Sequence, residues 1–146
     1  MPINRNEING GMNEEVFLPA SADAPVTPAE AVDMAMLTSF EEAQIDGEPD
    51  LVVELIELYL EDTAAKMGGL REALARSDGT TLRRLAHCLR GSSGNLGAHR
   101  MAALCGELEQ IDCHDLPQKA GELLPSLEQE FEHVGVIFTA ERQRRA

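Results

Sequence analysis

Residues 82–96 read LRRLAHCLRGSSGNL, and their spacing is that of a helix with one apolar face. Each residue advances about 100° around the axis of a helix. One apolar stripe along the helix then contains Leu82, Leu85, Leu89 and Leu96. His87 then lies roughly 155° from the middle of that stripe, on the opposite side of the helix. The stretch therefore predicts a half-buried helix that displays a histidine to solvent.

Three further segments repeat this helical pattern on either side of it. A long helix over residues 49–74 precedes it, and the turn at residues 77–79 lies between the two. Residues 98–111 and a last helix that begins near Pro117 have the same apolar spacing. Four amphipathic helices joined by short loops predict an all-α fold, an antiparallel up-down four-helix bundle.

The sequence predicts different structures for the two ends of the chain. Residues 1–26 are rich in Asn, Gly, Pro and Ser without helical periodicity, which predicts a flexible N-terminal tail. A capping box that begins at Thr27 predicts a short extra N-terminal helix through about Leu37. We expect the bundle to occupy residues 27–140 and residues 141–146 to form a frayed, basic C-terminal end.

The charge of the chain argues against several classes of partner. It has 26 acidic and 12 basic residues, a formal net charge of −14, so nucleic acids and anionic membranes would repel it. Its apolar runs fall short of the roughly 20 residues that cross a bilayer, and its N-terminus does not have the pattern of a secretory signal. We therefore expect a cytoplasmic protein that binds neither nucleic acid nor membrane.

Cysteines and carboxylates do not predict a metal site. Cys88, Cys105 and Cys113 do not have the paired spacing of metal or redox motifs, so we expect buried or half-buried thiols. A carboxylate-type metal bundle needs inward Glu-x-x-His pairs on facing helices, a requirement that the sequence does not meet. We expect neither a metal nor a cofactor on this chain.

The face that carries His87 is unusual for a scaffold helix. Gly91 lies one turn further along, and Gly94 is also on that side, although glycine lowers helix stability where Ala or Glu would raise it. Clearance is a physical reason, because a glycine lets another protein bring a reactive atom up to the imidazole, whose neutral ring has a nucleophilic nitrogen. Positive charge that would offset an anionic group there comes from Arg83, Arg84 and Arg90.

Other polar residues nearby have ordinary structural explanations. We expect the hydroxyls of Ser92 and Ser93 to hydrogen-bond within their own helix and Cys88 to pack at the side of the bundle. The other histidines are expected to be surface or capping residues: His99, His114 and His133.

The run AHCLRGSSGNLGA over residues 86–98 resembles the phosphorylation motif of the histidine phosphotransfer (HPt) domain family. The segment LCGELE at residues 104–109 is similar to the next helix of that family, and residues 48–60 resemble its first long helix. The resemblance covers about residues 33–138. It is specific because the histidine, a basic residue three positions on and a glycine four positions on fall inside one long matching run.

The resemblance implies roles for individual residues. His87 would be the phosphoryl acceptor, Gly91 would leave it accessible, and Arg90 would take the place of the basic residue, usually Lys, that steadies the phosphoryl group. The implied mechanism is a shuttle, in which the imidazole attacks a receiver-domain aspartyl phosphate in line and later donates the group to another receiver. Mg²⁺ is expected on the partner receiver. The candidate partner-binding residues are Arg83, Arg84 and Gly94.

Receiver domains are therefore the expected partners, with a hybrid sensor kinase as a further candidate, and we expect a monomer. We do not expect the chain to be an enzyme with its own ATP-dependent kinase activity. The sequence has no glycine-rich, nucleotide-binding loop of the P-loop type. The alternative is a docking or buffering module that binds receivers without passing phosphate on, which would not need the nucleophile of His87. The sequence leaves open whether the chain stands alone or is a piece of a hybrid sensor kinase.

Overall fold

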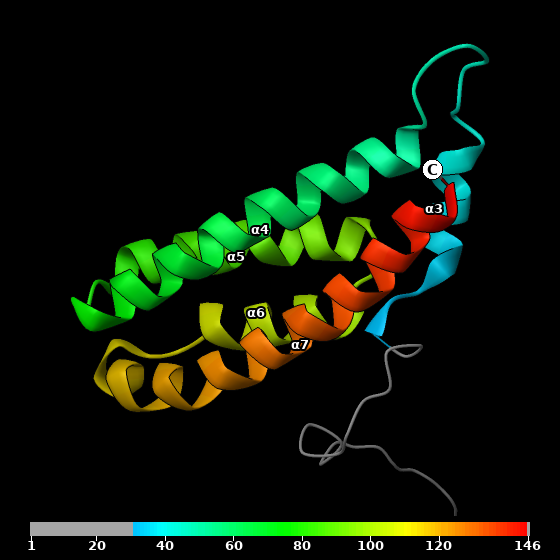
Figure 1. Cartoon of the computed structure of the whole chain (residues 1–146). Coiled ribbons are helices and arrows are strands. Elements are labelled where there is room, and N and C mark those ends of the chain that lie inside the picture. The colour runs from blue at the N-terminus through cyan, green and yellow to red at the C-terminus, as the bar shows by residue number, and fades with distance from the viewer. Residues whose placement is uncertain (1–30, 146) are drawn as a thin grey trace, which may run out of the picture.

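The computed structural model describes residues 31–145, and the long helices in this range form an antiparallel up-down bundle (Figure 1). The elements are α3 (Met34–Glu41), α4 (Leu51–Ala75), α5 (Gly79–Asn95), α6 (His99–Glu109), the 3-10 helix η2 (Cys113–Asp115) and α7 (Leu116–Arg145). Helices α4 to α7 each pack against the next one along the chain, and α7 closes the ring by packing against α4. The predicted all-α bundle is confirmed.

Aspartates begin the first helices of the bundle. The Asp50 carboxylate accepts hydrogen bonds from the backbone N–H groups of Val52 and Val53, at 2.9 and 3.3 Å. The Asp78 carboxylate accepts one from the N–H of Thr81 at 3.1 Å. These bonds satisfy amide donors that the first turn of a helix leaves without partners, so they fix where α4 and α5 begin.

The short N-terminal helix differs from its prediction. The predicted tail over residues 1–26 and the capping box at Thr27 lie outside the described residues. Within them, Val32 and Asp33 are not helical, so a helix that continues through to Leu37 is wrong. The physical reason is Asp33, whose N–H donates to the carbonyl of Gly97 at 2.8 Å and whose carboxylate caps α3. The bundle holds this residue in place, and a new helix begins after it.

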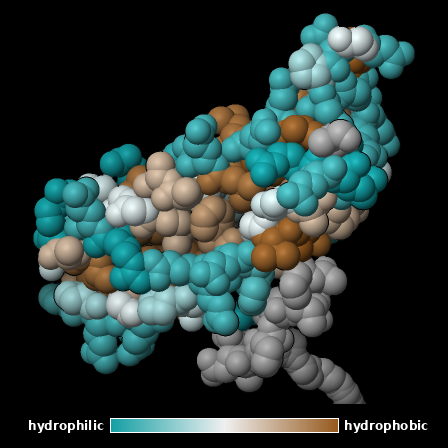
Figure 2. Space-filling view, in the orientation of Figure 1, coloured by the Kyte–Doolittle hydropathy of each residue, from teal (hydrophilic) through white to brown (hydrophobic). Residues whose placement is uncertain are grey.

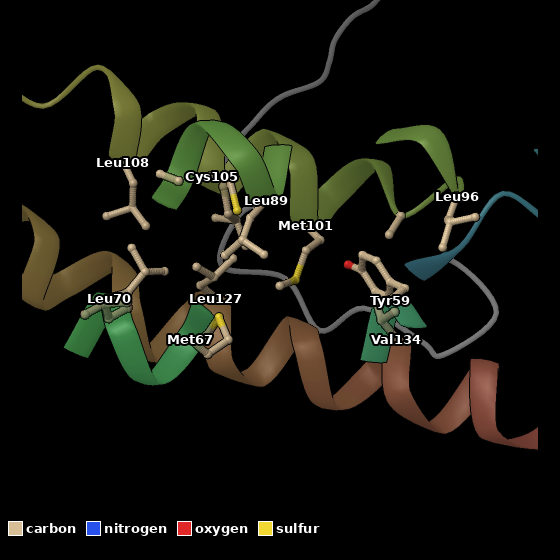
Figure 3. Packing of buried hydrophobic residues seen from close by; sticks show 14 of the residues in the cluster. Tyr59, Met67, Leu70, Leu89, Leu96, Met101, Cys105, Leu108, Leu127 and Val134 are labelled. Carbon is tan, nitrogen blue, oxygen red and sulfur yellow. The ribbon is translucent and has the colours of Figure 1, made fainter. Parts of the chain in front are cut away.

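The core lies between the four long helices (Figure 3). The apolar spacing predicted over residues 98–111 is confirmed, because its apolar residues are buried in α6 and just after it: Met101, Leu104, Cys105, Leu108 and Ile111. They meet Leu70 of α4, Leu89 of α5 and Leu127 of α7, each with 0 % of its surface exposed. On the face shown in Figure 2, hydrophilic residues cover most of the surface and apolar residues gather in a strip between α4 and α7.

A buried hydrogen bond joins α4 to α5. The hydroxyls of Tyr59 and Ser93 are 2.7 Å apart, and Ser93 is fully buried. Burial raises the pKa of Tyr59 to about 12, and its ring meets that of Phe138 edge-on with centroids 5.6 Å apart. The prediction that Ser93 bonds within its own helix is therefore wrong. For Ser92 it is confirmed, because its hydroxyl donates to the carbonyl of Leu89 at 3.4 Å.

A buried carboxylate lies in α7. Glu130 is 3 % exposed and lies 3.3 Å from Nε of Arg100 and 3.6 Å from Nδ1 of His133. Burial raises the pKa of Glu130 above its ordinary value, although Arg100 and His133 oppose the shift. His133 is thus half-buried beside a buried carboxylate and is not the surface residue predicted. Glu130 and His133 do form a Glu-x-x-His pair, but the facing helices carry no counterpart with that spacing.

The last turn of α7 is anchored by ion pairs. Arg145 contacts Glu141 at 2.7 Å, Asp50 at 3.3 Å and also Glu41, and its side chain is only 12 % exposed. These contacts tie the end of α7 to the end of α3 and the start of α4. The prediction of a frayed end is therefore wrong for residues 142–145. Between residues 31 and 145, none of the helices combines the length and apolar character needed to span a bilayer.

Two neighbouring glycines should respond in opposite ways to replacement by alanine. Gly97 has φ +84°, and a Cβ there would overlap the carbonyl oxygen of Asp33. Gly97→Ala should therefore lower the free energy of unfolding by roughly 1–3 kcal/mol. Gly94 is helical and a Cβ there would meet nothing within 4 Å. Gly94→Ala should be neutral or stabilising by up to about 1 kcal/mol. Urea unfolding monitored by circular dichroism checks both, and equal stabilities would contradict the argument.

Candidate functional site

The buried leucines of α5 fix the direction in which His87 points. Leu82 and Leu89 have 0 % of their surfaces exposed, whereas the side chain of His87 is 63 % exposed. The helix can rotate little without withdrawing those leucines from the core, so His87 remains on the outer face. The structure thus places this histidine where the helical spacing predicted.

The imidazole has a partner on the neighbouring helix. Nδ1 of His87 lies 2.6 Å from Oε2 of Glu109, the last residue of α6. Glu109 is only 19 % exposed, and its other oxygen, Oε1, lies 3.0 Å from Nη1 of Arg90. The carboxylate therefore lies between the imidazole and the guanidinium. Glu109 is not among the predicted site residues, although it is the last residue of the LCGELE segment that resembles the family's next helix.

The contact with Glu109 bears on which ring nitrogen of His87 carries the proton. A carboxylate can only accept a hydrogen bond, so Nδ1 carries the proton when the imidazole is neutral. The lone pair is then on Nε2, which has no hydrogen-bond partner among the described residues. The exposed ring therefore has an unprotonated Nε2, with the tautomer favoured by a neighbouring carboxylate.

Arg90 lies close to the imidazole but does not hydrogen-bond to its protonated nitrogen. Its Nη2 is 3.4 Å from Nδ1 of His87, and both groups are donors when Nδ1 carries the proton. Arg90 is 43 % exposed and its charge is balanced by Glu109. A positive side chain is therefore present at the site, held on the Nδ1 side of the ring by the carboxylate.

The glycines and the other arginines of α5 lie in different surroundings. A Cβ at Gly91 or Gly94 would meet no atom within 4 Å, so both positions border open space. Arg83 is half-buried, and its guanidinium lies over Gly79 at the start of the helix, while Arg84 is exposed. The structure brings His87 and Arg90 together with Glu109, but Arg83 and Arg84 are not part of that contact.

The cysteines are only partly as predicted. Cys105 is buried in the core, which raises the pKa of its thiol to about 12. Cys88 and Cys113 are exposed, so the prediction of buried or half-buried thiols is wrong for both. Cys88 follows His87 directly in α5 and, like it, is exposed.

An apolar groove lies beside α5. It has a volume of about 660 Å³ and runs between α3, α4 and the last two turns of α5. Its apolar lining is formed by Met36, Phe40, Leu55, Leu58, Tyr59 and Leu96. Leu58 is 63 % exposed, which is unusual for a large apolar side chain on a chain with this much charge. Asn95, on the rim of the groove, lies about 12 Å along the helix axis from His87.

Comparison with known proteins identifies the family. Residues 54–135 match the Hpt domain, a range that includes His87, Arg90 and Glu109. The chain belongs to the Hpt domain family. It is 34 % identical over 71 residues to histidine-containing phosphotransfer protein 2 of Arabidopsis thaliana and 28 % identical over 81 residues to protein 5 of the same plant. These matches cover 47 % and 53 % of this chain, which spans about half the length of each relative.

A solved structure resembles nearly the whole bundle. Histidine-containing phosphotransfer protein B (HptB) from Pseudomonas aeruginosa PAO1 superposes with a TM-score of 0.71 and 33 % sequence identity. The alignment covers 80 % of this chain and 97 % of HptB. The bundle described here therefore matches nearly the whole length of that protein.

Removal of the Glu109 carboxylate should change the tautomer of His87. In the wild type we expect the neutral ring to carry its proton on Nδ1, whereas in Glu109→Ala the Nε2–H form should become populated. Nitrogen-15 NMR of the imidazoles measures both populations, and the exposed His114 is an internal control that should not change. An identical tautomer ratio for His87 in the two proteins would mean that Glu109 does not set it.

Proposed function

We propose that this Hpt domain is a phosphoryl shuttle, which accepts a phosphoryl group on Nε2 of His87 from a receiver-domain aspartate and passes it to another receiver. The observation that carries this proposal is the His87–Glu109 contact, which leaves Nε2 as an outward nucleophile on the helix that matches the family. The names of the relatives, histidine-containing phosphotransfer proteins, support the same role.

The transfer step is an in-line displacement at phosphorus. The lone pair of Nε2 forms the new N–P bond while the bond from phosphorus to the aspartyl oxygen breaks, and the aspartate leaves as a free carboxylate. The ring then gains positive charge, because Nδ1 keeps its proton. The carboxylate of Glu109, 2.6 Å away, stabilises that charge. Return of the phosphoryl group to a second receiver follows the reverse path.

Arg90 and Gly91 have supporting roles in this proposal. Arg90 is exposed and long enough to turn toward a dianionic phosphoryl group once that group is on Nε2. Gly91 keeps the space next to the ring open for the receiver's own active site. The Mg²⁺ that offsets charge during transfer belongs to the receiver.

The apolar groove supplies a surface on which the receiver docks. It flanks the helix of His87, and it exposes Leu58 beside a half-buried Phe40. A receiver that covers the groove would bury this apolar surface and hold its aspartyl phosphate near the imidazole. Further contacts are proposed for the candidate partner-binding residues of α5: Arg83, Arg84 and Gly94.

The shuttle role also leads to expectations about the activity, partners, oligomeric state and location of the chain. A shuttle receives its phosphoryl group ready-made, so we expect no ATP-dependent kinase activity of its own, and a hybrid sensor kinase is a candidate donor. We expect a monomer in the cytoplasm, since two copies paired over the groove would block the receiver. The alternative function, docking on receivers without transfer, draws support from the groove but leaves the ordered His87–Glu109 pair without a use.

Substitution of His87 tests the shuttle directly. The purified chain and its His87→Gln variant are incubated with a phosphorylated receiver domain, and acid-labile, base-stable phosphate is measured on each. We expect label on the wild type alone, because glutamine has no nucleophilic nitrogen. Label on both proteins would assign the acceptor to another residue. Binding of receivers without label on the wild type would favour the docking module.

Leu58→Glu separates docking from chemistry. A charged side chain in the groove should slow phosphoryl transfer from the receiver by about tenfold or more. This is the effect expected when the docked complex no longer buries one large apolar side chain. Phosphorylation by the small donor phosphoramidate needs no docking and should proceed at the wild-type rate. The exposed Val136 on α7 gives a matched control, because Val136→Glu should leave both rates unchanged. Equal slowing with both donors would mean that the substitution disturbs the fold around His87.

A further inference from the structure

A second cluster of reactive side chains follows the last residue of α6. In the part of the chain that the structure describes, Asp112, Cys113 and His114 are a group whose possible metal-ligand atoms all lie within 4.8 Å of one another. All three side chains are exposed, and they occupy η2 and its capping position in the connection to α7. The phosphotransfer chemistry of His87 does not use any of them.

The three donors match a particular class of cation. A thiolate and an imidazole are ligands that Zn²⁺ and the later first-row transition metals prefer, whereas Mg²⁺ and Ca²⁺ require oxygen ligands. A carboxylate completes a set of three protein ligands, which is the number found where zinc keeps one position for water. The strongly negative chain, with a formal net charge of −14, also favours the approach of a cation.

The local backbone preorganises part of this set. Oδ1 of Asp112 accepts a hydrogen bond from the backbone N–H of His114 at 3.1 Å, which holds that carboxylate on the side of residue 114. The second oxygen, Oδ2, is left for a metal. Lys119, on the first turn of α7, pairs with Asp115 at 3.7 Å and not with the Asp112 carboxylate.

The sequence predicted no metal on this chain, but the closeness of these donors leads to a different inference. We propose that Asp112, Cys113 and His114 bind one zinc-type divalent cation, with water as the fourth ligand. Bonds of about 2.0–2.3 Å place the ligands of a tetrahedral zinc roughly 3.5 Å apart. The donors therefore have to approach by about 1 Å, which rotation of exposed side chains allows without movement of α6 or α7. The site would bridge the two helices through the loop that follows Glu109.

A titration of the full-length chain with Co²⁺ tests the site. Co²⁺ reports thiolate ligands through a near-ultraviolet charge-transfer band and four-coordinate geometry through its visible bands. The protein is reduced, free of metal and without a polyhistidine tag. We expect one Co²⁺ per chain with both signals, and displacement of Co²⁺ by Zn²⁺. Cys113→Ser should remove the charge-transfer band, and His114→Ala should weaken binding by roughly tenfold or more.

Cys88 provides a matched control. It is also an exposed thiol that adjoins a histidine, His87, so the pair could bind metal by itself. We expect Cys88→Ser to bind Co²⁺ as the wild type does. Loss of the band in Cys88→Ser, with retention in Cys113→Ser, would overturn the proposal and move the metal to the phosphoacceptor face. Binding without a thiolate band, or with the same affinity in all variants, would identify adventitious binding and would also overturn it.

Discussion

The burial of the leucine face of α5 is the constraint on which the site depends. Leu82 and Leu89 are fully buried between the other helices, and that packing leaves a single orientation for the helix. His87 is then exposed, and Arg90 is directed toward the end of α6, where Glu109 meets both. The packing of α5 against α6 in the core therefore determines where individual polar atoms lie around the imidazole.

Much of this architecture could be predicted because it follows from periodicity. The apolar spacing of residues 82–96 predicts both the helix and the outward direction of His87. The spacing of residues 98–111 likewise predicts the buried face of α6. Those features depend on residues three and four positions apart, so one helix contains the necessary information. The openness of Gly91 also follows, since it lies one turn from the histidine on the same face.

The parts that could not be predicted are contacts between segments distant in sequence. Ser93 bonds to Tyr59 from another helix, and neither residue alone signals that pairing. The same is true of Arg145, which reaches acidic residues about a hundred positions away in the chain. Helical spacing places Cys88 at the flank of α5 but does not say whether a neighbouring helix covers it. Each of these outcomes depends on how the helices are aligned, which periodicity does not determine.

Glu109 shows most clearly what such a contact adds to function. A bare histidine on this helix would have either ring nitrogen available, and Arg90 would extend freely into solvent. In the neutral imidazole the carboxylate favours the proton on Nδ1, and its other oxygen pairs with the guanidinium. In the proposed transfer, an arriving phosphoryl group competes with Glu109 for Arg90, while the ring, now positive, strengthens its own bond to Glu109. The pairing partners therefore exchange as the phosphoryl group arrives, and each new charge meets an opposite charge already within reach.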